Sequence, residues 1–243
     1  MNTIPEVFGQ SNVVRLSDED ATVAVLERTV GRLWEAVNEL TRLRRTTRQR
    51  YRVTIFGSAR LKSGTPAYEG VKKLAAELAG MGCDILTGGG PGLMQAANEG
   101  AHSVDCNSLT RSVGINIELP FEQEVNPFVT EAFEHRTFFS RLHHFMIMSD
   151  AFVVTPGGIG SLLELSLCWQ LLQVRHLYNT PLILVGDMWV RLVEWARGAM
   201  LAEGNELASE VDLKIPICVD TIPKALAIIR ENRAAWLEAQ GMK

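Results

Sequence analysis

Long apolar runs, paired cysteines and a marked excess of charge are all missing from this chain of 243 residues. No apolar stretch approaches the ~18 residues of a membrane span, and no basic stretch followed by an apolar one opens the sequence. The cysteines form no Cys-x-x-Cys pair, which argues against a disulfide framework or a zinc knuckle. The four are Cys83, Cys106, Cys168 and Cys218. We therefore expect a protein of the reducing cytoplasm that is neither exported nor inserted into a membrane.

The charge balance is close to neutral, because 24 Lys and Arg face 28 Asp and Glu, for a formal charge of −4. This balance argues against a dedicated binder of polyanions. Hydrophobic residues make up 47% and charged residues 21%, close to the averages for soluble globular domains. The chain can therefore bury a substantial core.

Several common motifs of nucleotide binding and catalysis are absent. Residues 88–93 fail the Gly-x-Gly-x-x-Gly dinucleotide pattern because Leu93 takes the place of the last glycine, and no Gly-x-x-x-x-Gly-Lys-[Ser/Thr] loop occurs. A Gly-x-Ser-x-Gly elbow and a His-Glu-x-x-His pattern are missing too. NAD binding, triphosphate hydrolysis, serine hydrolysis and zinc peptidase chemistry are thus disfavoured. The adjacent His143 and His144 are expected to be surface or packing residues of a helix.

From residue 52 onward, short β-branched apolar runs alternate with amphipathic helical patterns, which is typical of βαβ units. Strands are predicted at 53–56, 83–86, 113–117, 151–154, 182–185 and 215–219. Helices are predicted at 66–80, 91–104, 136–148, 160–175, 187–202 and 222–239. The fold class is therefore α/β, a Rossmann-like doubly wound parallel sheet with helices on both faces. Ligands of such folds bind at the carboxyl ends of the strands.

Residues 1–50 are predicted to be an N-terminal extension with a long amphipathic helix, and residues 51–243 to be the Rossmann-like domain. After a helix-cap signal at 16–20, apolar residues recur at alternating spacings of three and four over nearly three heptads. They are Val23, Leu26, Val30, Leu33, Val37 and Leu40. Such a helix either lies on its own domain or packs against a second subunit, and the pattern favours the two equally.

A run of arginines follows this helix: Arg42, Arg44, Arg45, Arg48, Arg50 and Arg52. It could bind nucleic acid, but no aromatic platform accompanies it and the net charge of the chain is negative. A solvated helix end is therefore favoured, and nucleic acid is not an expected partner.

Three glycine-rich turns follow predicted strands and should open on one edge of the sheet. The first, Gly57-Ser58, is an ordinary turn by itself. The second, at 87–94, reads TGGGPGLM, and Pro91 suits the first turn of the next helix. Its glycines let the backbone approach a ligand, and free amides at the helix start would face an anion such as phosphate. A tight turn without a ligand is the alternative, but three consecutive glycines carry an entropic cost that a mere turn seldom needs.

The third turn, at 156–164, reads PGGIGSLLE and again leads from a strand into a helix. Ser161 could donate its hydroxyl to a phosphate. Glu164 falls about one helical turn later, so its carboxylate can lie over the same helix N-terminus. The alternative role of Glu164 is compensation of the helix dipole, worth only ~0.3–1 kcal/mol.

These turns, together with Arg141 eight residues before Ser149, resemble the Lonely Guy family, which was once widely misannotated as lysine decarboxylases. The resemblance covers residues 52–220 approximately. Members are phosphoribohydrolases that cleave adenine-type nucleoside 5′-monophosphates into free base and ribose 5-phosphate. The resemblance implies that Arg141 and Glu164 are catalytic. The substrate and its phosphate are expected to contact Gly57, Ser58, Gly88, Gly89, Gly90, Gly92, Met94, Gly157, Gly158, Gly160 and Ser161.

Cleavage of a ribose N-glycosidic bond develops positive charge at C1′, which a nearby carboxylate can stabilise while it activates water. Glu164 is expected to do this, and Arg141 to orient the phosphate or ribose and to keep Glu164 ionised. Two positions depart from the family pattern. Ser161 replaces a threonine but keeps the hydroxyl, and Leu142 stands where the family usually has lysine, which removes a charge from the expected site.

The expected substrate is AMP or a cytokinin-type nucleotide, and the expected assembly is a homodimer or a higher homo-oligomer. No cofactor and no metal are expected, and pyridoxal phosphate chemistry lacks a recognisable Schiff-base lysine. Two alternatives remain. A sensor or carrier would bind a nucleotide without hydrolysing it, which fits the missing charge at Leu142. Binding of single-stranded DNA would rely on the arginine run and would depend steeply on salt.

Overall fold

The computed structural model describes residues 19–42, 49–104, 110–118, 124–202 and 207–241, with side chains of residues 34–42 left out. The chain divides into two units, residues 1–46 and residues 47–243. The first unit contains one described helix, α1 (Glu19–Arg42), which begins with two acidic residues at its positive end. Residues 16–18 of the cap signal predicted at 16–20 lie outside the described residues. Four apolar residues of the predicted a/d pattern are between 50% and 65% exposed: Val23, Leu26, Val30 and Leu33.

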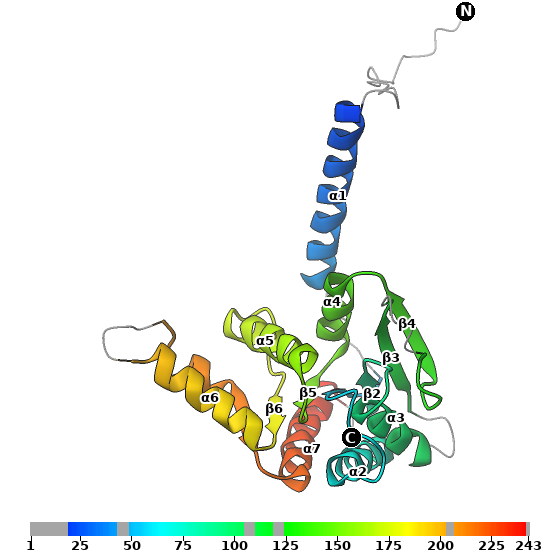
Figure 1. The fold of residues 1–243 in the computed structure, drawn as a ribbon, viewed down its shortest axis with the longest axis vertical. Helices are drawn as coiled ribbons and strands as arrows, with labels where there is room; N and C mark the ends of the chain where they lie inside the picture. The colour runs from blue at the N-terminus through cyan, green and yellow to red at the C-terminus, as the bar shows by residue number, and fades with distance from the viewer. Residues whose placement is uncertain (1–18, 43–48, 105–109, 119–123, 203–206, 242–243) are drawn as a thin grey trace, which may run out of the picture. The chain divides into compact units, whose positions relative to one another are not determined.

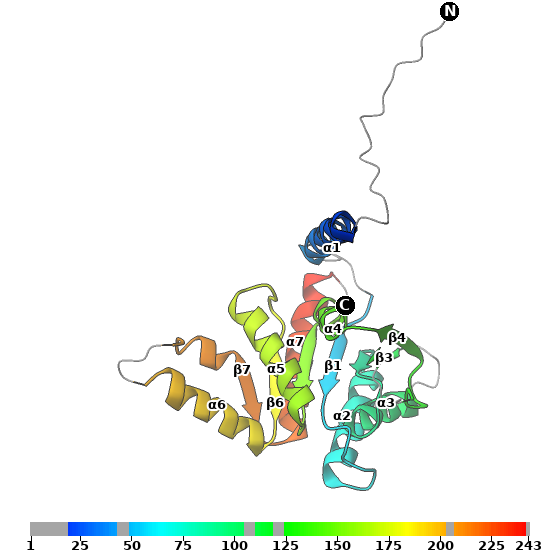
Figure 2. The same ribbon diagram turned by 45° about the horizontal axis from the view of Figure 1, so that its top comes forward.

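The second unit is built on a seven-stranded sheet in which every described pairing is parallel. Its order is β4-β3-β2-β1-β5-β6-β7 (Figure 1). The strands are β1 (Arg52–Phe56), β2 (Asp84–Thr87), β3 (Ser112–Ile117), β4 (Glu131–His135), β5 (Ala151–Val154), β6 (Leu182–Val185) and β7 (Pro216–Val219). Figure 2 shows β1 in the middle, with β3 and β4 on one side and β6 and β7 on the other. The sheet therefore changes its direction of growth between β1 and β5, which is the ligand-binding position of a doubly wound fold.

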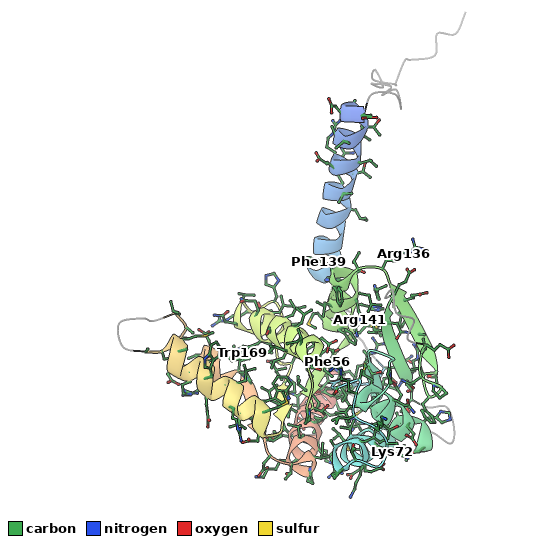
Figure 3. All side chains as sticks on the ribbon, viewed as in Figure 1. Phe56, Lys72, Arg136, Phe139, Arg141 and Trp169 are labelled. Carbon is green, nitrogen blue, oxygen red and sulfur yellow. The ribbon has the colours of Figure 1, made fainter. Side chains whose placement is uncertain are left out.

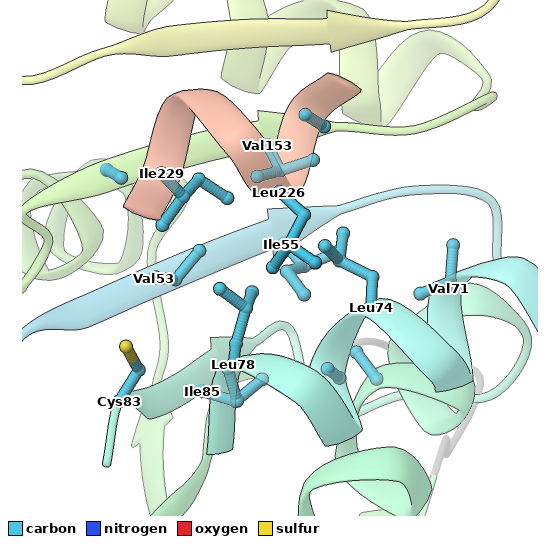
Figure 4. Close-up of a cluster of buried hydrophobic side chains, with 14 of the residues drawn as sticks. Val53, Ile55, Val71, Leu74, Leu78, Cys83, Ile85, Val153, Leu226 and Ile229 are labelled. Carbon is cyan, nitrogen blue, oxygen red and sulfur yellow. The ribbon is translucent and has the colours of Figure 1, made fainter. Parts of the chain in front are cut away.

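Helices cover both faces of this sheet. The helices are α2 (Pro66–Gly80), α3 (Leu93–Val104), α4 (Phe138–Met148), α5 (Ile159–Gln173), α6 (Asp187–Met200) and α7 (Ile222–Ala239). One apolar core joins the sheet to α2, α3 and α7, and includes Ile55, Leu74 and Leu226 (Figure 4). The second core joins the opposite face to α4, α5 and α6, and includes Phe145 and Leu165. Burial on both faces explains why the central strands read as continuous apolar runs.

The predicted α/β fold class is confirmed, but the prediction of six strands was wrong because it missed β4. This strand lies at the edge of the sheet, and its burial alternates between half-buried and exposed positions. Its sequence, EAFEH, has only two apolar residues, so it lacks the apolar run that marked the other strands. The prediction that α3 begins at Pro91 was also wrong. The helix begins at Leu93, because Gly92 has a positive φ of 71° that a helix does not allow.

The arginine run ends in structural ion pairs. Arg50 Nε lies 2.8 Å from Asp84 Oδ1, and Arg52 Nε lies 3.7 Å from Asp84 Oδ2. Asp84 is buried at the start of β2, and these two cations supply its counter-charge. Residues 43–48 of the run lie outside the described residues. None of the helices described is long and apolar enough to cross a lipid bilayer.

Candidate active site

The three glycine-rich turns meet at the carboxyl edge of β1, β2 and β5, where the sequence placed them. The turn after β1 links the other two, because the Ser58 amide donates to the Pro156 carbonyl at 3.0 Å and the Leu93 amide donates to the Ser58 carbonyl at 2.8 Å. Ser58 therefore fixes the turn after β2 and the turn after β5 relative to each other. Both connections are backbone hydrogen bonds, so they depend on the path of the chain rather than on a particular side chain.

Several of the turn glycines are required by packing. A Cβ at Gly57 would overlap the Thr155 hydroxyl, and a Cβ at Gly92 would overlap the Ser58 carbonyl. Gly88 is less restricted, because a Cβ there would meet only the ends of two flexible side chains, the guanidinium of Arg141 and Met94 Sδ at 2.7 Å. Gly57 and Gly92 therefore have a structural reason to be glycine whether or not a ligand binds.

Gly158 and Gly160 are different. A Cβ at either position would have no atom within 4 Å. Both lie at the start of α5, whose N-cap, Gly158, makes no side-chain capping bond. The first backbone bond of the helix runs from the Leu162 amide to the Gly158 carbonyl at 3.0 Å, so the preceding amides are not used within the helix. This helix start has open space and unused donors, which is the arrangement that binds phosphate.

A buried polar network holds the turn after β2. Thr87 Oγ1 accepts from the Gly89 amide at 2.9 Å and donates to Asn98 Oδ1 at 2.7 Å. Asn126 Nδ2 lies 3.0 Å from the carbonyls of Gly89 and Gly90 and 3.0 Å from Asn98 Oδ1. Thr87, Asn98 and Asn126 are all buried. The loop is therefore fixed before any ligand binds.

Sequence reasoning missed this network. Asn98 was a detectable signal, since it is a polar residue among the alanines on the inward face of α3. Asn126 carried no local signal, because it lies in an irregular segment and meets the turn only through the tertiary fold.

Asn116, at the carboxyl end of β3, was missed as well. Its Oδ1 atom is buried and has no hydrogen-bond partner within the described parts of the chain. Gly89, with a φ of 72°, faces it, because a Cβ at Gly89 would overlap Asn116 Oδ1. Asn116 therefore occupies the space that a side chain at position 89 would need.

Arg141 and Glu164 approach each other from different helices. Arg141 projects from α4 and Glu164 from α5, and the distance from Arg141 Nη1 to Glu164 Oε1 is 3.4 Å. Both side chains are nearly buried, at 12% and 10% exposure. Arg141 Nε also donates to the Ile115 carbonyl at 2.9 Å, and its guanidinium lies 5.3 Å from the centre of the Phe145 ring. Arg141 is thus held in place by groups other than Glu164. Figure 3 labels Arg141 next to α4.

Burial dominates the electrostatics of this pair. Removal from water raises the pKa of Glu164 from 4.5 to about 7, and the charge of Arg141 lowers it only in part. Burial also lowers the pKa of Arg141. The charge of Arg141 thus favours ionised Glu164, but burial outweighs it, so a carboxyl with this pKa is divided between its two protonation states near neutral pH.

Three other residues discussed in the sequence analysis lie in the structure as follows. Leu142 is 9% exposed, so position 142 is a packing position on α4. Ser161 is buried on α5, and its Oγ occupies the space that a Cβ at Gly157 would need. His144 shares a hydrogen bond of 2.9 Å with Nε2 of His135, so it is a packing residue, as predicted.

A hollow of about 510 Å³ lies beside the turn after β2, on the side of α2 and α3. Its lining includes Arg60, Lys62, Tyr68, Gly92 and Gln95. Within the described ranges, no group of three or more His, Cys, Asp or Glu side chains is arranged to hold a metal ion.

Comparison with known proteins gives one family match. The model of a family described as "possible lysine decarboxylase" matches residues 94–229, which is more than half of the chain. The matched segment includes both Arg141 and Glu164. No curated protein matches the sequence significantly.

Solved structures share the fold at low sequence identity. A molybdenum cofactor binding protein from the phototrophic bacterium Rippkaea orientalis is 20% identical, with a TM-score of 0.56, over 76% of this chain and 98% of that one. The Moco carrier protein of Chlamydomonas reinhardtii is 18% identical, with a TM-score of 0.54, over 77% and 99%. The protein TM1055 is 18% identical, with a TM-score of 0.55, over 74% and 99%. These similarities show a common fold.

Proposed function

Since the chain belongs to the family described as possible lysine decarboxylases, the Lonely Guy family, we propose that it is a phosphoribohydrolase of purine nucleoside 5′-monophosphates. The substrate is AMP or a cytokinin-type nucleotide, and the products are the free base and ribose 5-phosphate. The observation that carries this proposal is the buried pair of Arg141 and Glu164 beside an uncapped helix start.

The 5′-phosphate fits the start of α5. Gly158 and Gly160 leave open space there, and the uncapped amides supply donors at the positive end of the helix dipole. Glu164 lies on the same helix, four residues after Gly160, so one rigid element would hold both the phosphate and the reactive carboxylate. Such positioning can contribute several kcal/mol to catalysis.

Ionised Glu164 would stabilise the positive charge that develops at C1′ and accept a proton from the attacking water. The water oxygen bonds to C1′ as the bond to the base nitrogen breaks, and the electron pair leaves with the base. The base nitrogen takes up a proton from solvent, and Glu164 returns the proton that it accepted to solvent. A pKa near 7 suits a general base at neutral pH, because the group is partly ionised and still a good proton acceptor. Arg141, held by the Ile115 carbonyl, would orient the substrate and limit the rise of the pKa of Glu164.

The test is to incubate the purified protein with AMP, other nucleoside monophosphates and an N6-prenylated analogue, and to separate the products by chromatography. Glu164→Gln is expected to reduce release of free base at least ~100-fold while nucleotide binding persists. Glu77→Gln on α2, which removes an exposed ion pair with Arg230, is the matched control and should retain full activity.

Retention of full turnover by Glu164→Gln would refute the role of Glu164. Binding of nucleotide by the wild-type protein without any release of base would instead favour a sensor or carrier.

A further inference from the structure

The hollow beside the turn after β2 is not used by the reaction proposed at Glu164. Its walls come from the loop after β1 and from the first turns of α2 and α3, which contribute Tyr68 and Gln95. Its volume is about 510 Å³, within the range of roughly 300–1,000 Å³ that is common for small-molecule sites. The hollow is therefore large enough for a ligand of its own.

The hollow and the start of α5 lie on opposite sides of the turn after β1. Helices α2 and α3 cover one face of the sheet, whereas α5 covers the other. Ser58 lies between them, because its backbone bonds to Pro156 before α5 and to Leu93 at the start of α3. The lining of the hollow includes neither Arg141 nor Glu164. A molecule in the hollow would therefore leave the proposed phosphate position at α5 free.

The hollow carries uncompensated positive charge. Its lining contains Arg60 and Lys62 and no aspartate or glutamate. Both cations are exposed, and neither forms an ion pair with a described residue. The nearby acid Glu99 accepts from the Tyr68 hydroxyl at 2.7 Å, but its charge is balanced by Lys72 Nζ, also at 2.7 Å. In a chain with a net charge of −4, this hollow therefore favours an anion.

The side chains around the hollow can donate hydrogen bonds to such an anion. Arg60 and Lys62 are joined by the Ser63 hydroxyl and the Gln95 amide, and the start of α3 adds the positive end of a helix dipole. Charge-assisted hydrogen bonds from arginine and lysine are typical of phosphate binding. Two cations separated by one residue match the two neighbouring charged groups of a diphosphate.

We propose that this hollow is a second ligand site of the protein and that it binds a small molecule through a diphosphate group. Arg60 and Lys62 each hold one phosphate, and Leu61 and Tyr68 give apolar surface to the rest of the molecule. The site is separate from the phosphate position proposed at the start of α5, so it does not depend on hydrolysis of a nucleotide.

The first test is calorimetric titration of the full-length protein with inorganic pyrophosphate at low salt, where screening is weak. The hollow variant, Arg60→Gln/Lys62→Gln, is expected to bind pyrophosphate at least ~10-fold more weakly than the wild type. The matched control is Arg191→Gln/Lys224→Gln, which removes the same two charges from exposed positions on α6 and α7 and should keep the wild-type affinity. Equal affinity in the hollow variant, or no binding by the wild type, would overturn the proposal.

Orthophosphate tests the diphosphate group itself. It can engage only one of the two cations at a time, so it should bind the wild type at least ~10-fold more weakly than pyrophosphate. Equal affinity for the two anions would refute recognition of a diphosphate.

The variant Gly160→Ala separates this site from the one at α5. It should keep the wild-type affinity for pyrophosphate, whereas the hollow variant should keep the wild-type affinity for AMP. Loss of pyrophosphate binding in Gly160→Ala but not in the hollow variant would place the probe at α5 and refute a second site. Because pyrophosphate binding is measured without turnover, failure of the proposed hydrolase activity would leave this result standing.

Discussion

The guanidinium of Arg141 lies 3.4 Å from the carboxyl of Glu164, yet the pKa of that carboxyl is raised to about 7. A nearby cation by itself would lower the pKa of a carboxyl. The reversal arises because Glu164 is enclosed on α5 and loses its hydration, and this effect of burial on the pKa outweighs the charge of Arg141. The result is a buried carboxyl that changes its charge near neutral pH.

The proposed mechanism predicts an acid limb in the pH profile. Turnover needs ionised Glu164, so kcat/KM is expected to rise with pH and to reach half its maximum near pH 7. The measurement is the initial rate of base release from AMP between pH 5 and pH 9. A rate that stays constant through this range would show that Glu164 does not act in its ionised form.

Arg141→Met should shift this limb. Without the guanidinium, burial acts unopposed, so the pKa of Glu164 rises and the residual activity should reach half its maximum above pH 7. The rate at optimum pH is expected to fall roughly 100-fold or more, because an orienting cation is lost. Arg136→Met is the control, since Arg136 is 90% exposed and lies just before α4. If the Arg141→Met limb moves to lower pH, the assigned electrostatic role of Arg141 is wrong.

Glu164 should also make stability depend on pH. Its pKa is about 7 in the folded protein and 4.5 when unperturbed, so between these pH values the folded state keeps a proton that the unfolded state releases. The stabilising contribution of protonated Glu164 is fully present below pH 4.5 and is lost as pH rises through about 7. We expect the free energy of unfolding of the wild type, relative to that of Glu164→Gln, to be about 3 kcal/mol lower at pH 8 than at pH 5. Urea unfolding of both proteins at the two pH values measures this difference. A difference that is the same at both pH values would contradict the raised pKa.

Two glycines should respond differently to alanine. Gly89→Ala is expected to lower the free energy of unfolding by 1 kcal/mol or more, roughly, because φ is 72° and the new Cβ would overlap Asn116 Oδ1. Gly160→Ala meets no atom within 4 Å and lies in a helix, so stability should be unchanged or rise by about 0.5–1 kcal/mol. Its affinity for AMP should nevertheless fall, because the added methyl group occupies the space proposed for the phosphate. Thermal unfolding and calorimetric titration separate these effects, and unchanged affinity in Gly160→Ala would move the phosphate elsewhere.

Much of the central sheet could be predicted because its strands are buried on both faces. The apolar runs predicted β5 and β6, and the amphipathic patterns between such runs predicted α2 and α7. The predicted bounds of these four elements are the observed ones. The edge strand β4 could not be recognised in this way, since only one face is partly buried and its residues are mostly charged or small. Its existence depends on pairing with β3, and a single sequence does not reveal that pairing.

The candidate site also combines features that the local sequence predicts with features that depend on tertiary contacts. Local motifs placed the three turns on one edge, but they did not reveal which glycines are required by packing. The packing reasons come from distant residues, such as Thr155 for Gly57 and Asn116 for Gly89. The raised pKa of Glu164 could not be predicted, because it comes from the depth of burial, which depends on the tertiary fold.

The central position of β1 has a consequence for how the protein is made. Val53 pairs with Ala151 of β5, so a long stretch of chain must be synthesised before the two halves of the sheet can join. Closing so large a loop has an entropic cost and slows folding relative to local contacts. Arg141 precedes β5 and Glu164 follows it, so a nascent chain that has formed only β1 to β4 holds neither the Glu164 carboxylate nor the start of α5. Under the proposed function, nucleotide can therefore assist folding only after β5 has docked beside β1.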